Sequence, residues 1–287
     1  MKNWLLAIRI KTLTAAISPV IIGSALAYHD GSFKGVIFVI ILIASILIQI
    51  GANIANDVYD FEKGSDRFDR LGPIRVTQAG LISPRKMKHG MGIVFSLAIC
   101  FGALLVNEGG WPIVYIGLAS IVAGIAYTGG PYPLGYHGWG DVFVFIFFGL
   151  IAVPGTYYLH LGYITKLSIY VGVAMGMLSS ALLLVNNIRD IDTDQLSGKK
   201  TLAVRIGKNA SRVQYMVLIL LPFALPIYFW WSYNKMSLLI LLFLFPYSIH
   251  LIKKIYFLKG AKLNNLLENT SHFIIMYTLL FSIGLIV

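Results

Sequence analysis

Long apolar runs alternate with short polar segments along the whole chain. Val36–Ala55 has twenty residues without a charged side chain, which is long enough for a helix to cross the roughly 30 Å hydrocarbon layer of a bilayer. Because backbone groups in lipid must be hydrogen-bonded within the segment, these runs are predicted to be helices. The pattern predicts about nine spans: Thr12–Ala27, Val36–Ala55, Gly90–Val106, Trp111–Tyr127, Val142–Leu159, Leu167–Val185, Val213–Trp231, Met236–Ile252 and Phe273–Val287.

Composition supports this fold class. Hydrophobic residues make up 57% of the chain and charged residues 12%, and the mean hydropathy is +0.78, which excludes an ordinary soluble domain. Most connections between the runs are short, as expected for antiparallel neighbours in a helix bundle. We therefore predict an all-α polytopic membrane protein in which residues 1–287 form a single transmembrane domain.

The net charge of +11 is distributed unevenly over the connections. With the N-terminus in the cytoplasm, 20 of the 23 Lys and Arg residues lie on the cytoplasmic side, and only Lys34, Lys166 and Lys235 lie on the other. This asymmetry is typical of membrane proteins and predicts a cytoplasmic N-terminus. The positive charge is then explained by topology and contact with anionic lipid, so nucleic-acid binding is not expected.

Eight of the twelve acidic residues lie in two predicted cytoplasmic segments, 57–89 and 186–212. Both segments begin with related sequences, NDVYD from Asn56 and NNIRD from Asn186, after a charge-free span. If each helix continues past the membrane interface, residues four apart share a face, so Asn56 lies beside Asp60, and Asn186 beside Asp190. We expect these two helix ends to face each other across the bundle.

Amide and carboxylate oxygens at two facing helix ends favour a hard divalent cation. Mg²⁺ is usually held by one or two carboxylates together with phosphate oxygens of a substrate, and the negative ends of two helix dipoles favour a cation there. The candidate metal ligands in these two stretches are Asn56, Asp57, Asp60, Asn186, Asp190 and Asp194.

Basic residues accompany both acidic stretches, and together they predict a diphosphate site. A metal would bridge phosphate oxygens while Arg and Lys stabilise the charge of the leaving group. The alternative is that both loops are ordinary solvated connections, but two loops with the same Asn-x-x-x-Asp spacing favour the site. The candidate diphosphate ligands are Lys63, Arg67, Arg75, Arg189, Lys199, Lys200 and Arg205.

At this point the chain resembles a known family. The stretches NDVYD and NNIRDIDTD resemble the two aspartate-rich motifs of the UbiA superfamily of intramembrane aromatic prenyltransferases. Within it, the strings DRLGPIRVTQAGLISP, YTGGPYPLGYHGWGD and DTDQLSGKKTLAVRIG are similar to the branch that prenylates 1,4-dihydroxy-2-naphthoate in menaquinone synthesis. The resemblance implies helices around a central cavity, located in a bacterial plasma membrane, with the active site facing the cytoplasm.

The resemblance also implies the reaction. Mg²⁺ and the bases would ionise a polyprenyl diphosphate, the naphthoate ring would attack the allyl cation, and the ring carboxylate would leave as CO₂ to give demethylmenaquinol. The partners are polyprenyl diphosphate, 1,4-dihydroxy-2-naphthoate and membrane lipid. Residues with a direct role in catalysis are expected to be Asp60, Asp190, Asp194 and Lys199. In the family's first motif, the last acid falls at Gly64 of this chain, and Asp66 is expected to replace it as a metal ligand.

Polar and aromatic residues near the same membrane face are candidates for binding the acceptor. A basic side chain at the start of the first span would pair with the acceptor carboxylate, although such residues are also common membrane anchors. Aromatic rings there would stabilise the cation, although interfacial rings are common as well. The acceptor-binding candidates are Arg9, Lys11, Gln78, Tyr127, Tyr132 and Asp141.

Other functions stay open at this stage. The same chemistry could serve another aromatic acceptor, such as 4-hydroxybenzoate, homogentisate or haem. A cation-coupled transporter would place its ion site near the bilayer midplane on interrupted helices, whereas here the acids lie at the cytoplasmic rim. A CDP-alcohol phosphotransferase would carry a DG-x-x-A-R pattern, which this sequence lacks.

Overall fold

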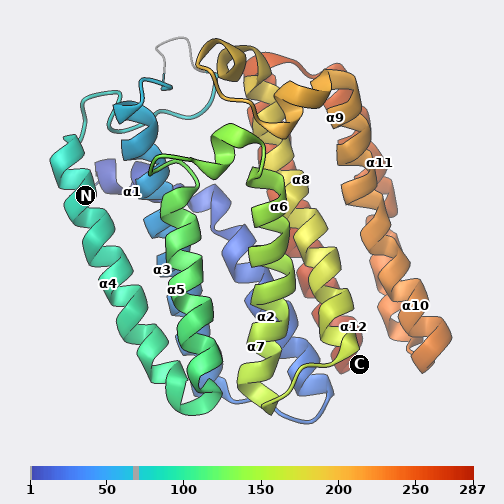
Figure 1. The fold of residues 1–287 in the computed structure, drawn as a ribbon. Helices are drawn as coiled ribbons and strands as arrows, with labels where there is room; N and C mark the ends of the chain where they lie inside the picture. The colour runs from blue at the N-terminus through green and yellow to red at the C-terminus, as the bar shows by residue number, and fades with distance from the viewer. Residues whose placement is uncertain (1, 67–70) are drawn as a thin grey trace.

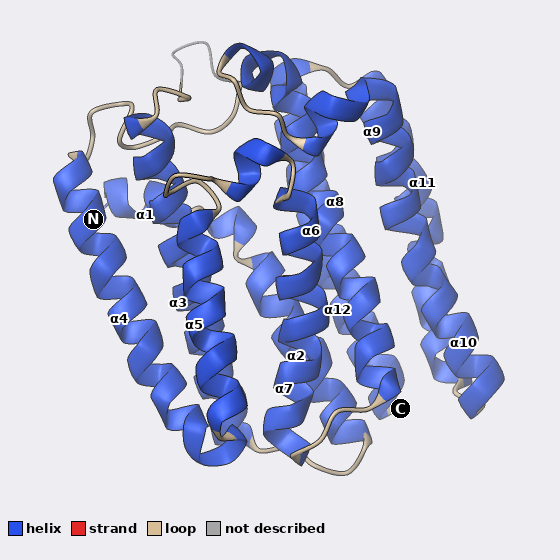
Figure 2. Ribbon diagram, viewed as in Figure 1, coloured by secondary structure: helices blue, strands red, loops and turns tan. Residues whose placement is uncertain are grey.

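The computed structural model describes residues 2–66 and 71–287, and this part of the chain is helical with no strand (Figures 1 and 2). The α-helices are α1 (Lys2–Ile8), α2 (Thr14–His29), α3 (Gly35–Glu62), α4 (Pro84–Gly109), α5 (Trp111–Ala126), α6 (Gly140–Phe145), α7 (Ala152–Leu161), α8 (Lys166–Leu196), α9 (Leu202–Leu220), α10 (Ala224–Tyr233), α11 (Phe245–Phe257) and α12 (Leu263–Ile286). Short 3₁₀ segments are η1 (Ile10–Thr12), η2 (Leu134–His137), η4 (Leu221–Phe223), η5 (Met236–Leu244) and η6 (Gly260–Lys262), and η3 (Ile146–Ile151) is π-helical.

The all-helical membrane fold predicted from the apolar runs is confirmed. Among the described residues, 7 helical runs are long and apolar enough to cross a membrane, or 8 if the bent pair 2–12 and 14–29 counts as one span. The bend of 52° in this pair follows Arg9, which has a left-handed backbone conformation (φ 54°). Helix α5 is shorter, at 16 residues. The count of nine spans stays a prediction.

Helix α8 runs through the middle of the bundle and carries a large share of its core. It packs against α2, α6, α7, α9 and α12, and buried side chains such as Met175, Leu178 and Leu184 fill these contacts. Gly149 in η3 lies so close to α8 that a Cβ there would approach the Gly172 carbonyl oxygen to 2.5 Å. The bundle is therefore packed backbone to backbone at this crossing.

The connections that carry the polar motifs gather at one end of the bundle (Figure 1). The segment after α3, the connection between α5 and α6, and the connection between α8 and α9 all lie there, whereas the C-terminus lies at the opposite end. This arrangement agrees with the alternation that the charge distribution predicts. The side of the membrane on which each end lies stays a prediction.

A cavity of about 470 Å³ lies between α2, α3, α4, α5, the α6–α7 segment and α8. Its lining is mostly apolar, and Leu105, Ile113 and Leu159 close it toward the end of the bundle that holds the C-terminus. Its polar residues come mainly from the other end: Arg9, Gln49, Asn53, Asn56, Tyr127 and Asn186. The bundle therefore encloses an apolar chamber with a polar end beneath the gathered loops.

Candidate active site at the polar end of the cavity

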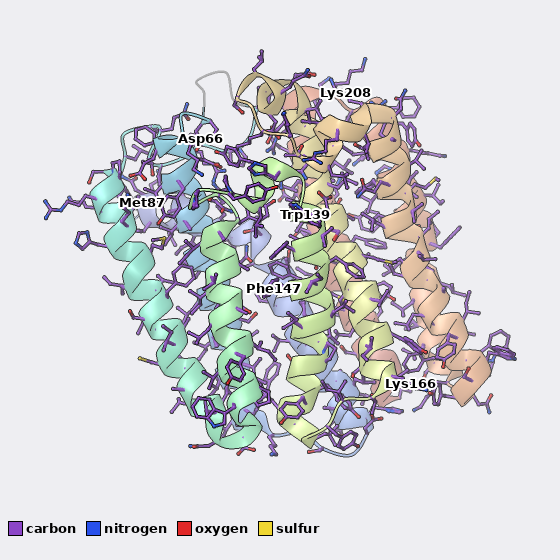
Figure 3. The ribbon with its side chains drawn as sticks, viewed as in Figure 1. Asp66, Met87, Trp139, Phe147, Lys166 and Lys208 are labelled. Atoms are coloured by element: carbon purple, nitrogen blue, oxygen red, sulfur yellow. The ribbon has the colours of Figure 1, made fainter. Side chains whose placement is uncertain are left out.

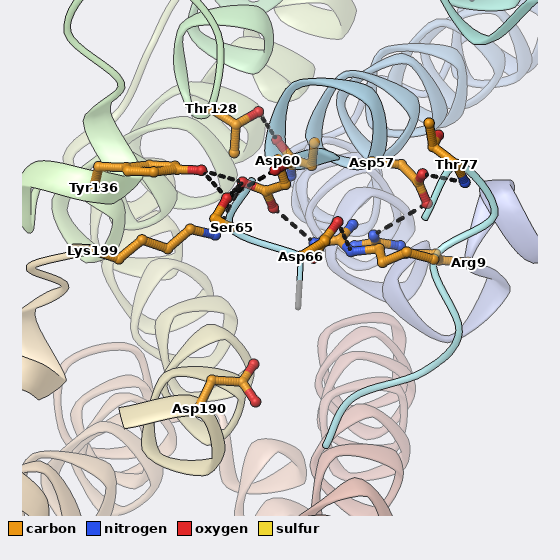
Figure 4. A network of polar contacts seen from close by, with 12 residues as sticks. Arg9, Asp57, Asp60, Ser65, Asp66, Thr77, Thr128, Tyr136, Asp190 and Lys199 are labelled. Atoms are coloured by element: carbon orange, nitrogen blue, oxygen red, sulfur yellow. Dashed lines mark hydrogen bonds and ion pairs between the residues drawn. The ribbon is translucent and has the colours of Figure 1, made fainter. Parts of the chain in front are cut away.

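Asp60, in the last turn of α3, is the centre of a polar network. Its side chain is 2% exposed. Arg75 Nη2 donates to Asp60 Oδ2 at 3.0 Å, and Lys199 Nζ and the Tyr136 hydroxyl donate to Asp60 Oδ1 at 3.0 and 2.9 Å (Figure 4). Ser65 completes the network, because its hydroxyl contacts that of Tyr136. One buried carboxylate thus joins α3 to segments of the chain that are far apart in sequence.

Asp66 joins this cluster through a turn after α3. Gly64 has φ 69°, a left-handed conformation that a glycine adopts without strain, and the Ser65 amide donates back to the Asp60 carbonyl at 3.0 Å. The turn brings Asp66 into the interior, where its Oδ2 lies 3.4 Å from Arg75 Nε. Asp60 and Asp66 therefore share one guanidinium, and the acid displaced from position 64 lies at the same site.

Asp57 is directed to a different partner. Its Oδ1 accepts the backbone amide of Thr77 at 3.0 Å and its Oδ2 that of Val76 at 3.2 Å, and Arg9 Nη2 lies 3.9 Å from Oδ2. These bonds fasten the segment just after Arg75 to the end of α3. Both Asp57 oxygens are engaged in positioning Arg75, so they are less available to a metal than those of Asp60.

The second acidic stretch lies in the last turns of α8. Arg189 Nε and Nη2 donate to the two Asp190 oxygens at 2.8 and 2.6 Å, and Arg189 Nη1 donates to Asn264 Oδ1 at 2.6 Å. Asn264 Nδ2 in turn donates to the Leu71 carbonyl at 2.9 Å. Arg189 is buried, and it fixes Asp190 and connects α8 to α12 and to the segment before Arg75.

Asn56 and Asn186, the first residues of the two repeated motifs, line the same cavity. The Thr128 hydroxyl donates to Asn56 Oδ1 at 3.0 Å and fixes this amide at the polar end. Figure 4 shows Asp190 on α8 apart from the Asp60 cluster, with the two motifs on different helices. The first residues of both motifs therefore lie on one cavity, whereas a metal site shared by their carboxylates stays a prediction.

The other predicted diphosphate ligands differ in their placement. Lys63 Nζ donates to the Gly130 carbonyl at 3.0 Å. Burial lowers the pKa of Lys63 and is the largest effect; nearby Lys199 lowers it further, whereas Asp60 opposes the shift. Arg205 donates to the carbonyls of Lys200 and His137, which joins two loops. The Lys200 side chain is exposed. The backbone carbonyl of Asp194 accepts a hydrogen bond from the Lys199 amide. Arg67 lies outside the described residues.

The predicted acceptor ligands are also divided. Arg9 and Tyr127 line the cavity, whereas Lys11 lies at the surface in an ion pair with Glu268 at 2.6 Å. The remaining three do not line the cavity. Tyr132 is exposed and stacks on His137, and Gln78 is half-buried. Asp141 is buried, and Asn187 Nδ2 lies 3.5 Å from its Oδ2.

Sequence reasoning noted Tyr136 only as one of many aromatic residues and missed its place in the site. Its hydroxyl contacts Asp60 and Ser65, and burial together with the Asp60 charge raises its pKa, so the phenol stays protonated. Gln49 and Asn53, which also line the cavity, were missed as well. Together with Asn56 they form an i, i+4, i+7 row of polar residues in a charge-free span, and such a row indicates a polar helix face directed into the bundle.

The donor set fits a hard cation bound together with a phosphate. Asp60, Asp66 and Asn56 supply only oxygen ligands. In residues 2–66 and 71–287, no three His, Cys, Asp or Glu side chains lie close enough together to hold a metal by themselves, so phosphate oxygens would have to complete its coordination. Two carboxylates that leave room for phosphate oxygens suit Mg²⁺. Arg75 Nη1 is buried without a hydrogen-bond partner in the described chain, so this donor is available to an anion.

Comparisons with known proteins agree with this geometry. The family model described as the UbiA prenyltransferase family matches residues 16–275. A 1,4-dihydroxy-2-naphthoate octaprenyltransferase of Haemophilus influenzae is 35% identical and the alignment covers 100% of this chain and 96% of that protein. The protein of the same name from Escherichia coli is 39% identical over 76% of this chain and 72% of its own.

Solved structures show the same fold. A UbiA homologue from Archaeoglobus fulgidus bound to GPP and Mg²⁺ has a TM-score of 0.72, with 99% of this chain and 100% of that chain covered. An apo UbiA homologue from Aeropyrum pernix K1 has a TM-score of 0.68, with 97% and 98% covered. Sequence identities of 14% and 15% limit both comparisons to the fold.

Proposed function

The chain belongs to the UbiA prenyltransferase family, and we propose that it transfers a polyprenyl group from polyprenyl diphosphate to 1,4-dihydroxy-2-naphthoate. CO₂ and diphosphate are released, and demethylmenaquinol is formed. The relatives of this name, matched over most or all of the chain, support the acceptor. The observation that carries the proposal is an apolar cavity whose polar end holds Asn56 and Asn186, with the Asp60, Arg75 and Lys199 cluster one helical turn beyond Asn56 on α3.

The diphosphate of the donor binds at this polar end. Arg75 offers its unpartnered Nη1, and Lys199 can exchange its bond to Asp60 for one to a phosphate oxygen. Asp60, Asp66 and Asn56, with Asn186 and Asp190 from α8, would hold Mg²⁺, which would supply positive charge to offset that of the leaving diphosphate. Because the buried bases are already positioned, little reorganisation is needed when the prenyl carbon–oxygen bond breaks and its electron pair leaves with diphosphate.

The prenyl group occupies the apolar part of the cavity. Water is largely excluded there, so an allylic cation has time to react with the ring instead of with solvent. Phe143 and Phe147 stack at 6.0 Å in the wall, and aromatic faces attract a cation. The ring carbon then forms the new carbon–carbon bond, and the electron pair released with CO₂ restores the aromatic ring.

The acceptor enters beside Arg9. This side chain lines the cavity and its guanidinium also lies near Asp57, so it can pair with the ring carboxylate before that group leaves as CO₂. Tyr127 lies on the cavity wall at the same end. The proposed location is the plasma membrane of a bacterium, with this end of the bundle toward the cytoplasm.

The test is an acceptor panel with purified protein in detergent or nanodiscs. The protein is supplied with a polyprenyl diphosphate and Mg²⁺, and with 1,4-dihydroxy-2-naphthoate, 4-hydroxybenzoate or homogentisate. We expect a prenylated product and stoichiometric CO₂ only with the naphthoate. Turnover of another acceptor without CO₂ would support a different branch of the family, and substrate flux across liposomes without any product would support a transporter.

A further inference from the structure

Tyr136 is an aromatic residue of the site that contacts both acidic and basic groups. It lies in η2, within the connection between α5 and α6, which contains no Lys or Arg between Tyr127 and Trp139. Its hydroxyl donates to Asp60, whereas its ring lies 4.6 Å from Lys199 Nζ and 5.2 Å from Lys63 Nζ (Figure 4). Both distances are within the range of an attractive cation–π contact.

The two lysines come from different loops. Lys63 is the C-cap of α3 and its Nζ donates to the Gly130 carbonyl, whereas Lys199 precedes α9 and its Nζ donates to Asp60. Two like charges near one another repel, and an aromatic face with a hydroxyl bonded to Asp60 offsets this repulsion. The ring of Tyr136 therefore adds to the hydrogen bonds that Lys63 Nζ makes to the Gly130 carbonyl and Lys199 Nζ makes to Asp60, near the place where a diphosphate binds under the proposed function.

We propose that Tyr136 is a positioning residue with two separate roles: its ring holds Lys199 and Lys63 for the donor diphosphate, and its hydroxyl fixes the orientation of Asp60. The inference rests on the proposed function for the identity of the donor. A connection without basic residues thereby contributes to anion binding through the lysines of two other loops.

The backbone around Tyr136 is anchored independently of its side chain. The Lys200 amide donates to the Tyr136 carbonyl at 2.8 Å, and Arg205 Nη2 donates to the His137 carbonyl at 2.7 Å. Substitutions at position 136 leave both bonds in place. The ring and the hydroxyl can therefore be removed in turn while the connection keeps its attachment to the α8–α9 loop.

The experiment measures binding of an unreactive donor, geranylgeranyl S-thiolodiphosphate, by calorimetry at saturating Mg²⁺. Tyr136→Phe keeps the ring, and we expect its affinity for the donor to stay within about threefold of the wild type. Tyr136→Leu removes the ring, and we expect about tenfold weaker binding. Tyr132→Leu is the matched control in the same connection, because that ring stacks on His137 and is exposed, and we expect no change.

Two further readouts separate the roles of the ring and the hydroxyl. Tyr136→Phe should require about tenfold more Mg²⁺ for half-maximal donor binding, because Asp60 loses a hydrogen bond to its charged oxygen. In a double-mutant cycle, adding Tyr136→Leu to Lys199→Met should weaken binding by no more than about threefold, because the ring acts largely through Lys199. Melting curves in detergent establish that each variant is folded.

The outcomes distinguish this inference from the proposed function. If the wild type binds no prenyl donor analogue, the proposed function fails and the inference fails with it. If the wild type binds but Tyr136→Leu binds equally well, or the cycle is additive, only the inference is overturned. A loss in Tyr136→Phe as large as that in Tyr136→Leu would also overturn it, because the hydroxyl and not the ring would then control donor binding.

Discussion

Lys199 Nζ lies 3.0 Å from Asp60 Oδ1, although 139 residues separate them in the chain. The contact joins the loop after α8 to the end of α3 and so brings together the two repeated motifs. Asp66 lies at the same end of the bundle, away from the end that holds Lys166 (Figure 3). Under the proposed function, a diphosphate would compete with Asp60 for this base.

Asp60→Asn is expected to abolish turnover. The substitution keeps the size of the side chain but removes the charge that orders Arg75 and Lys199. With one negative charge fewer, the cluster is left with an excess of buried positive charge, and a cation is no longer attracted. We expect at least about a hundredfold loss of turnover, since interactions with charged groups contribute about 1.5–3 kcal/mol each. Prenyl transfer is measured by chromatography of the product, and wild-type activity would contradict the role of Asp60.

Asp190→Asn and Asp192→Asn form a matched pair on α8. Asp190 lies at the same end of the bundle as the Asp60 cluster and is bonded by the buried Arg189. Asp192 is 76% exposed and pairs with Lys208 at the surface. We expect Asp190→Asn to lose nearly all activity and Asp192→Asn to keep it, because an exposed ion pair contributes about 0–1 kcal/mol to stability. Equal loss in both variants would indicate a general effect on α8 instead of a role at the site.

Removal of divalent cations tests the cofactor. EDTA should stop turnover, and excess Mg²⁺ should restore it, because Asp60, Asp66 and Asn56 provide oxygen ligands only. The same treatment should leave the melting temperature nearly unchanged, since Arg75 and Lys199 already compensate the buried carboxylate without a metal. Activity that persists in EDTA would exclude a role for the metal.

The helices could be predicted from local sequence, and so could the helix faces that the two motifs share, because both depend on short-range regularities. A charge-free run such as Val36–Ala55 has only helical solutions in lipid, and the spacing of Asn56 and Asp60 follows the period of the helix. The family pattern led us to expect Asp66 in place of the acid missing at Gly64, and the structure places Asp66 beside Arg75, which also bonds Asp60.

The partners of individual side chains could not be predicted, because they depend on contacts distant in sequence. Tyr136 reaches Asp60 across 76 residues, and Arg189 is bonded to Asn264 across 75. Neither contact leaves a local pattern. Asp57 is a different case in part: its position about 100° around the helix from Asn56 was available from the sequence, whereas its bonds to the backbone of Val76 and Thr77 were not.

Asp57→Asn is expected to weaken the fold more than the chemistry. An amide has one acceptor oxygen, so only one of the two backbone amides at Val76 and Thr77 keeps its bond, and we expect a destabilisation of about 1–3 kcal/mol. Arg75 directly precedes these two residues, so loosening their backbone would also displace Arg75. The KM for the donor should therefore rise, while the requirement for Mg²⁺ stays unchanged. Melting and steady-state kinetics measure both effects. A changed Mg²⁺ requirement would instead identify Asp57 as a metal ligand.

Gly149→Ala is expected to destabilise the bundle, whereas Gly155→Ala is not. A Cβ at position 149 would lie 2.5 Å from the Gly172 carbonyl oxygen and 2.6 Å from the Gly176 Cα, both of them backbone atoms that cannot rotate away. Overpacking of this kind costs about 1–3 kcal/mol, and it would separate η3 from α8. At Gly155, in the same transmembrane run, no atom lies within 4 Å of the added Cβ, and an alanine favours the helix. Melting of both variants in one detergent should therefore show a lower transition for position 149 alone, and equal transitions would contradict the close crossing of η3 and α8.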